Sequence, residues 1–302
     1  MRSHWTLPLF LMVAGCGAAG TSDRVSVLGV DRLSGELAAQ EVELPGADMV
    51  SVRGPAGVVL VGATIDGGRA VGGVPPDCQL RRKVSGSLVA RTVPCVMLLG
   101  EYAALERGRQ FLLAAGAEAL PPALVLASDS AAPGLHYVPS ADAFTLGEGP
   151  RGARVPGALN PGAVAREMAR RQLRSIAEAH PEEAEGIALF LGAAAAADPG
   201  YLAASEPGGD PVGQLDLSRP LPAGAAPSAV LAGALWAWAD ASGDLTAASR
   251  AALAAARALG AGAADPATVL SLVAAQLDGA ERDQACAVFR ARLHASGIAA
   301  CP

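Results

Sequence analysis

The 302-residue chain contains few histidines, few aromatic residues and no excess of basic charge. Only 4% of its residues are aromatic, and alanine supplies much of the 51% hydrophobic fraction. The 23 lysines and arginines are outnumbered by 29 aspartates and glutamates, which gives a net charge of −6. This balance argues against nucleic acid as a partner, since nucleic-acid-binding domains carry a basic surface. The four histidines stand far apart in the sequence, as expected of surface or helix-cap residues rather than metal ligands: His4, His136, His180 and His294.

Several motifs that indicate an enzyme or a cofactor site are also missing. No Cys-x-x-Cys pair suggests a cysteine zinc site, and no Gly-x-Ser-x-Gly elbow, Walker-type loop or calcium loop occurs. Residues 147–152 match Gly-x-Gly-x-x-Gly, but Pro150 falls where a nucleotide-binding helix should begin, so we expect a turn. The sequence therefore predicts no cofactor and no bound metal. Apart from the arginine-rich helix below, the only basic triplet is Arg-Arg-Lys at residues 81–83, a pattern typical of a solvated strand face.

The first fifteen residues have the features of a bacterial export signal. Arg2 provides a positive start, and residues 7–13 form an apolar run too short to cross a bilayer, which needs about 20 residues. The Val-Ala-Gly-Cys segment ending at Cys16 resembles a lipobox, and Gly17 resembles the residue that follows the lipidated cysteine in outer-membrane lipoproteins. We expect a signal peptide at 1–15 and a lipidated tether at 16–24. A diderm outer membrane is the expected location; an ordinary cleaved signal with a chance cysteine is the alternative.

The remaining cysteines are even in number, as expected for an exported protein in an oxidising setting. Four cysteines allow three pairings. The local pairing is favoured because each pair lies within one segment of the chain: Cys78–Cys95 and Cys286–Cys301.

The chain changes character near residue 150, which predicts an α+β fold with a β-rich part packed on a mainly helical part. Residues 25–150 contain short apolar runs separated by glycine and proline, and one helical segment at 101–115. The predicted strands are 25–30, 49–52, 58–61, 93–99, 123–127 and 134–146. Residues 151–302 are mostly helical in pattern. The predicted helices begin at Pro161 and Pro181 and cover 228–241, 246–259, 266–277 and 281–295.

The predicted helix from Pro161 to about His180 contains Arg-Glu-Met-Ala-Arg at residues 166–170. Two histidines at this i, i+4 spacing would bind one zinc ion, but guanidinium has no lone pair to offer a cation. The helical period places Arg166 and Arg170 at the edge of an apolar stripe. It also places Glu167 and Arg171 on an opposite, solvated face with Arg174 and Glu178. On that face Glu167–Arg171 and Arg174–Glu178 have the spacing of salt bridges. The alternative to a former metal site is that Arg166 and Arg170 border a core face, with their aliphatic stems packed on it and their charged ends in water.

Four segments in order resemble the gluzincin metallopeptidases, the clan that includes thermolysin. Residues 136–149 resemble the edge strand of that family, and 160–165 resemble the lead-in to its metal-binding helix. Residues 184–188, Ala-Glu-Gly-Ile-Ala, resemble the segment that supplies the third zinc ligand, and 231–236 resemble a later helix of lipoprotein-type relatives. The resemblance covers roughly residues 100–240. It implies a zincin-like helical part whose site positions are Arg166, Glu167, Arg170 and Glu185.

At these positions the chain departs from the family in ways that exclude ordinary zinc catalysis. Arg166 and Arg170 stand in place of the histidine ligands, Glu167 matches the general base and Glu185 matches the glutamate ligand. Leu189 replaces an aspartate that orients a ligand histidine. The segment between Arg170 and Glu185 is also shorter than in thermolysin. One carboxylate cannot replace the three protein ligands of a catalytic zinc.

Charge balance predicts where the two arginines point. Buried carboxylates left without their metal are costly, so Arg166 or Arg170 is expected to pair with Glu185. These residues predict a catalytically inactive, metallopeptidase-like lipoprotein, held at the membrane by its lipid and binding a protein or peptide, or serving a structural role. One alternative is an unrelated α+β lipoprotein scaffold with a coincidental motif, and the other is an enzyme with unrecognised chemistry. A strand over the arginine helix, with Glu185 on the adjacent helix, would favour the first interpretation.

Overall fold

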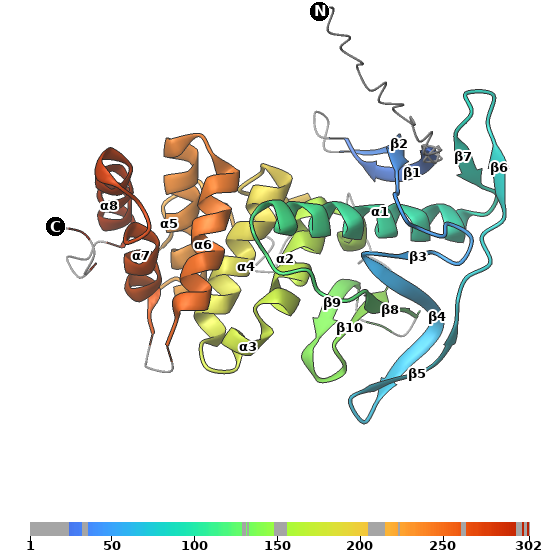
Figure 1. Ribbon diagram of the computed structural model, residues 1–302, viewed down its shortest axis with the longest axis horizontal. Coiled ribbons are helices and arrows are strands. Elements are labelled where there is room, and N and C mark those ends of the chain that lie inside the picture. The colour runs from blue at the N-terminus through green and yellow to red at the C-terminus, as the bar shows by residue number, and fades with distance from the viewer. Residues whose placement is uncertain are drawn as a thin grey trace, which may run out of the picture.

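The computed structural model consists of two β-sheets, a long helix between them and a group of packed helices (Figure 1). This arrangement confirms the predicted α+β class, with a β-rich part packed on a mainly helical part. None of the described helices is long and apolar enough to span a bilayer. The expected signal peptide, Cys16 and the tether before Arg24 lie outside the described residues. The structure describes residues 24–31, 36–128, 131, 133–147, 156–204, 215–222, 224–260, 264–293, 298 and 301.

The first sheet contains four strands in the order β2-β1-β7-β6. Strand β1 pairs antiparallel with β2, with Arg24 opposite Glu43, and parallel with β7, with Val25 opposite Leu88. Val25, Ser26 and Val27 of β1 are all buried, so both faces of this strand are covered at its start. The strands of this sheet are β1 (Arg24–Val30), β2 (Leu37–Glu43), β6 (Leu80–Arg82) and β7 (Leu88–Ala90).

The second sheet has a parallel centre and an antiparallel edge. Its main path is β3-β4-β8-β10-β9, and a further strand, β5, pairs with β4. Strands β4, β8 and β10 run parallel, whereas β9 pairs antiparallel with β10 and forms the edge next to the helices (Figure 1). The bounds are β3 (Arg53–Gly54), β4 (Gly57–Asp66), β5 (Arg69–Val74), β8 (Ala123–Ala127), β9 (Gly134–Val138) and β10 (Ala143–Gly147).

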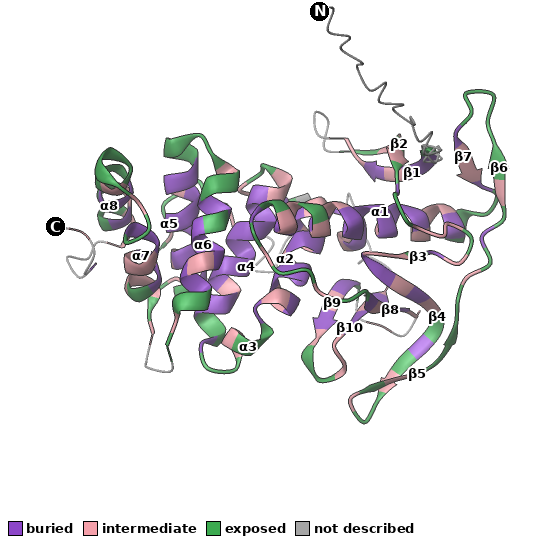
Figure 2. Cartoon of the chain, viewed as in Figure 1, coloured by how far each residue is buried: buried purple, intermediate pink, exposed green. Residues whose placement is uncertain are grey.

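Helix α1 (Val93–Ala114) lies between the two sheets and joins them to the helical part (Figure 1). Its Pro94 occupies the first turn, where a missing N–H costs nothing. Gly100 approaches β1 so closely that a Cβ there would lie 2.6 Å from the carbonyl oxygen of Leu28. Tyr102, on the same helix, is buried against Gly54 of the second sheet. The helix therefore forms the centre of a core shared by both sheets, as its buried surface shows in Figure 2.

The helical part begins at Asn160, which caps its first helix. The Asn160 side chain accepts hydrogen bonds from the N–H groups of Gly162 and Ala163, so the predicted cap is confirmed. Helix α4 begins at Pro181, as predicted, and crosses both α2 and α5. The helices are α2 (Pro161–Gln172), α3 (Arg174–Ala177), α4 (Pro181–Ala196), α5 (Pro227–Ser242), α6 (Leu245–Ala258), α7 (Pro266–Ala274) and α8 (Gly279–Leu293).

Several predicted elements differ from the structure. Residues 93–99 are not a strand but the first two turns of α1, and 49–52 form a turn. A short apolar run cannot by itself distinguish a strand from a buried helix, and here the N-terminal proline begins a helix. The single strand predicted at 134–146 is a hairpin of β9 and β10. The helix predicted to reach His180 ends at Gln172, because Leu173 leaves helical geometry.

Both predicted disulfides are present. Cys78 bonds to Cys95, which fastens the segment before β6 to the first turn of α1. Cys286 of α8 bonds to Cys301. Each bridge closes a short loop, since the sequence separations are 17 and 15 residues.

Replacing Cys78 and Cys95 together by alanine is expected to lower the free energy of unfolding by about 3 kcal/mol, because a loop of this length loses that much closure entropy in the unfolded chain. Urea unfolding of the oxidised wild type and the double variant measures the difference. The reduced wild type provides a control that loses both bridges. A double variant as stable as the oxidised wild type would contradict the expectation.

Candidate functional site

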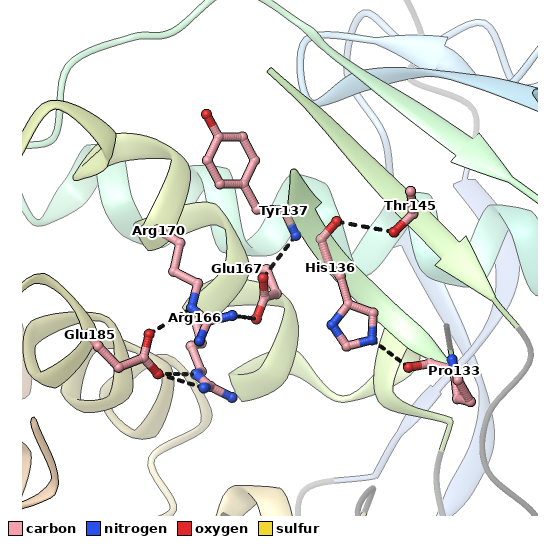
Figure 3. Close-up of polar contacts among 8 residues, drawn as sticks. All are labelled: Pro133, His136, Tyr137, Thr145, Arg166, Glu167, Arg170 and Glu185. Carbon is pink, nitrogen blue, oxygen red and sulfur yellow. Dashed lines mark hydrogen bonds and ion pairs between the residues drawn. The ribbon is translucent and has the colours of Figure 1, made fainter. Parts of the chain in front are cut away.

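The predicted site residues come together where α2 and α4 cross beneath the edge strand β9 (Figure 3). Arg166 donates from Nε and Nη2 to Oε1 of Glu185, at 3.0 and 2.5 Å. Arg170 donates from Nε to Oε2 of the same carboxylate, at 2.7 Å. The predicted ion pair is therefore present, and both arginines take part in it. We call these three residues and Glu167 the arginine–glutamate cluster.

Glu167 is held from two sides. Its Oε1 accepts a hydrogen bond from Nη1 of Arg170 at 2.9 Å, and its Oε2 accepts one from the backbone N–H of Tyr137 in β9 at 2.9 Å. Because β9 is an edge strand, this N–H has no neighbouring strand to pair with, and Glu167 takes that place. Both oxygens of the carboxylate that matches a general base thus accept a hydrogen bond, and the side chain is almost fully buried.

The cluster is largely removed from solvent. The exposed fractions of the side chains are 5% for Glu167, 14% for Arg166, 23% for Glu185 and 35% for Arg170. Burial alone raises the pKa of Glu185, but the charges and hydrogen bonds of Arg166 and Arg170 outweigh it and hold that pKa below its ordinary value. Two arginines and two glutamates sum to zero, so the buried group carries no net charge.

The structure corrects the predicted solvated face of this helix. Glu167 and Arg171 are buried, because β9 and the turn after it cover the side of α2 that the helical period alone assigns to solvent. Arg171 does not pair with Glu167. It donates from Nε and Nη2 to the two oxygens of Asp142, at 2.9 and 3.0 Å. Arg174 also contacts Asp142 at 2.9 Å and does not pair with Glu178, which is exposed.

Asp142 is a site residue that the sequence did not reveal. It lies in the turn between β9 and β10 in a left-handed conformation, with φ at 45°. Hydrogen bonds from Arg171 lower its pKa to about 2 despite partial burial. The hydroxyl of Tyr137 also donates to it, at 3.0 Å. These contacts fasten the β9–β10 hairpin onto α2. No sequence pattern pairs a turn aspartate with an arginine 29 residues later.

Tyr201 also lies at the cluster, and the sequence did not indicate it as a site residue. Its hydroxyl is buried and has no hydrogen-bond partner among the described residues, and burial raises its pKa. The ring packs against Gly162 of α2, and a Cβ at Gly192 of α4 would lie 2.6 Å from the hydroxyl. Only glycine at both positions leaves room for this tyrosine where the helices cross. The glycines thereby set how closely α2 and α4, and with them Arg166 and Glu185, approach.

Two pockets flank the cluster and share Glu185 as a lining residue. The α5-side pocket has a volume of about 540 Å³, and its lining is mostly apolar: Arg166, Glu185, Leu189, Leu215, Asp216, Arg219, Pro220, Leu221, Pro222, Ala225, Ala226, Ser228 and Ala229. The α3-side pocket has a volume of about 410 Å³ and is lined by Tyr137, Pro139, Arg170, Arg174, Ser175, Ala177, Glu178, Pro181, Ala184 and Glu185. Both volumes are typical of ligand pockets.

The histidines in the described residues do not join the cluster. His136 points away from it and contacts the carbonyl oxygen of Pro133 at 2.6 Å (Figure 3). His180 precedes α4, is buried and contacts the carbonyl oxygen of Gly260 at 2.7 Å. His4 and His294 lie outside the described residues. Across the part of the chain that the structure describes, no three His, Cys, Asp or Glu side chains form a group that could bind a metal.

Comparison with known proteins adds no relative to this picture. No family model matches the chain, and no curated protein matches it significantly.

Replacing Glu185 by leucine is expected to lower the free energy of unfolding by about 3 kcal/mol, because it leaves Arg166 and Arg170 partly buried without their shared partner. Chemical unfolding of the purified protein measures this loss. Glu178→Leu is the matched control, since Glu178 is exposed, and it should change stability by less than about 0.5 kcal/mol. Equal effects of the two substitutions would show that the cluster does not stabilise the fold.

Proposed function

We propose that the chain is a catalytically inactive, metallopeptidase-like lipoprotein that binds extended peptide segments in the two pockets beside the arginine–glutamate cluster. The observation that carries the proposal is that Arg166 and Arg170 both donate hydrogen bonds to Glu185, which lines both pockets. In a metallopeptidase, histidines at positions 166 and 170 would bind zinc together with the glutamate at 185. Here Arg166 and Arg170 stand at those positions and donate hydrogen bonds to Glu185.

The surroundings of the cluster support the same proposal over an unrelated scaffold. An antiparallel edge strand, β9, lies over the arginine-bearing helix, and Glu185 stands on the adjacent helix. The resemblance of the sequence to gluzincins predicts this combination, whereas a chance motif gives no reason for it.

Binding rather than catalysis fits the chemistry of the cluster. Glu167 is buried and accepts a hydrogen bond at each oxygen, and Arg166 and Arg170 offer no lone pair for a metal. The pockets on either side have room for side chains, and their apolar walls favour apolar ones. A peptide crossing from one pocket to the other would pass over a group with no net charge. A lipid on Cys16 would hold these pockets close to the membrane. The features of the signal peptide indicate the outer membrane.

Restoring histidine at both arginine positions is expected to create a zinc site. Arg166→His/Arg170→His would place two imidazoles at i, i+4 on α2 with Glu185 as the third ligand, which leaves one position open. We expect one zinc per folded chain, measured by elemental analysis and by calorimetric titration. The wild type should hold no stoichiometric zinc and should not digest casein.

Adding Glu185→Gln to the double-histidine variant is the control for that experiment, because it should weaken zinc binding at least about tenfold by removing the charged ligand. Zinc binding that ignores Glu185, or a folded double variant without zinc, would favour the unrelated scaffold. Stoichiometric zinc or clear casein digestion by the wild type would instead favour an enzyme.

Filling either pocket with an aromatic ring is expected to weaken peptide binding at least about tenfold, because the ring occupies space that a peptide side chain needs. Ala229→Trp fills the α5-side pocket, and Ser175→Trp fills the α3-side pocket. Peptides selected on the wild-type protein provide the probe, and fluorescence anisotropy measures their affinity. Ala258→Trp on the exposed end of α6 is the control. Selected peptides that bind all three variants equally would place the binding surface elsewhere.

A further inference from the structure

The β6–β7 hairpin projects from the end of the first sheet at which the described chain begins (Figure 1). Its turn, residues 83–87, joins Arg82 to Leu88, and Leu88 lies opposite Val25 in the parallel pairing of β7 with β1. Lys83 confirms the placement, since its Nζ donates to Oγ of Ser26 at 2.8 Å. Whatever precedes Arg24 therefore enters the fold beside this turn.

Hydrogen bonds give the turn a defined shape. The N–H of Lys83 donates to the carbonyl of Ser87, and that of Gly86 donates to the carbonyl of Lys83, at 2.7 and 3.0 Å. The hydroxyl of Ser87 donates to Glu41 of β2 at 2.7 Å, which fastens the turn to the sheet. These hydrogen bonds fix the conformation of the turn, so the tip of the hairpin points in a defined direction.

The chemistry of the tip differs from that of the whole chain. Arg81, Arg82 and Lys83 are all exposed, although the chain has a net charge of −6. Val84 follows them and is fully exposed, as the tip in Figure 2 shows. An exposed valine beside three cations has the composition of a segment that meets an anionic lipid surface, where cations bind headgroups and an apolar side chain enters the interface.

Two acidic side chains of β2 lie near the tip. Glu43 pairs with Arg24 at 3.3 Å, and Glu41 accepts hydrogen bonds from Ser87 and Ser85, which leave its negative charge in place. The described residues place no carboxylate within ion-pair distance of Arg81 or Lys83. These two exposed cations carry more positive charge than Glu41 offsets, and this charge is available to a partner outside the fold.

We propose that the β6–β7 hairpin docks the anchored protein on an anionic membrane surface through Arg81, Lys83 and Val84. The inference rests on the lipid anchor at Cys16. Eight residue steps separate Cys16 from Arg24, which an extended chain spans in about 28 Å at most. The start of β1, and with it the turn beside Ser26, is confined to that distance from the bilayer. A short tether keeps the basic tip at high effective concentration over the lipid headgroups.

The test measures amide hydrogen exchange of residues 80–90 in the full mature chain attached to vesicles. Coupling the Cys16 thiol to a maleimide phospholipid anchors the chain whether or not bacteria lipidate it. We expect exchange in this segment to be slower by about threefold or more on phosphatidylcholine vesicles with 30% phosphatidylglycerol than on phosphatidylcholine alone. High salt should remove the difference, because it screens the headgroup charge.

For each variant we compare the ratio of the exchange rates on the two vesicle types. A substitution that loosens the hairpin raises both rates and therefore leaves this ratio unchanged. Arg81→Ser/Lys83→Ser should bring the ratio close to one, and Val84→Ser should reduce it. Arg69→Ser/Arg250→Ser removes the same charge from exposed positions elsewhere and should leave it unchanged. A ratio of one in the wild type, or a ratio that survives loss of the two cations, overturns the inference. Mass spectrometry of the exported protein tests the lipid on Cys16 separately.

Discussion

The close crossing of α2 and α4 is the constraint on which the rest of the site depends. Gly162 and Gly192 let the two helices and Tyr201 share a space that any side chain at either position would fill. At this separation Glu185 lies within reach of both Arg166 and Arg170, and all are largely buried. Desolvating ions costs several kcal/mol each unless their charges are matched. The cluster meets this requirement by holding two cations and two anions in contact.

The same constraint explains why the β-rich and helical parts pack as one unit. Glu167 needs a second donor, and the edge strand β9 has an N–H without a strand partner at Tyr137. Asp142, in the turn that follows, receives Arg171 and Arg174 from the same helix. The sheet edge is thus capped by charged side chains of α2 rather than by a further strand, a common way to protect an exposed edge. One helix supplies both the cluster and the contacts that place the sheet above it.

Sequence patterns predicted those features that depend on local signals. The Asn160 cap, the helix starts at Pro161 and Pro181, and the separate β-rich and helical parts followed from local patterns. The pair with Glu185 followed from charge balance applied to the positions that the gluzincin resemblance had singled out. The buried state of Glu167 and Arg171 was not predicted, because helical periodicity cannot tell which polar face a distant hairpin will cover. Asp142 and Tyr201 share this difficulty. Their roles arise from contacts 29 to 41 residues away in the chain.

The retained charges also bear on whether the site serves stability alone. Replacing a buried ion cluster by apolar residues of similar volume is often neutral or stabilising, so stability gives little reason to keep four charged side chains. Beside the two pockets, however, a cluster without net charge would offer polar atoms to the backbone of the peptide that we propose to bind there. A peptide backbone carries donors and acceptors in equal number, and its burial is costly unless they are paired. Arginines bound to a carboxylate provide donors there without attracting free anions, which an uncompensated arginine pair would do.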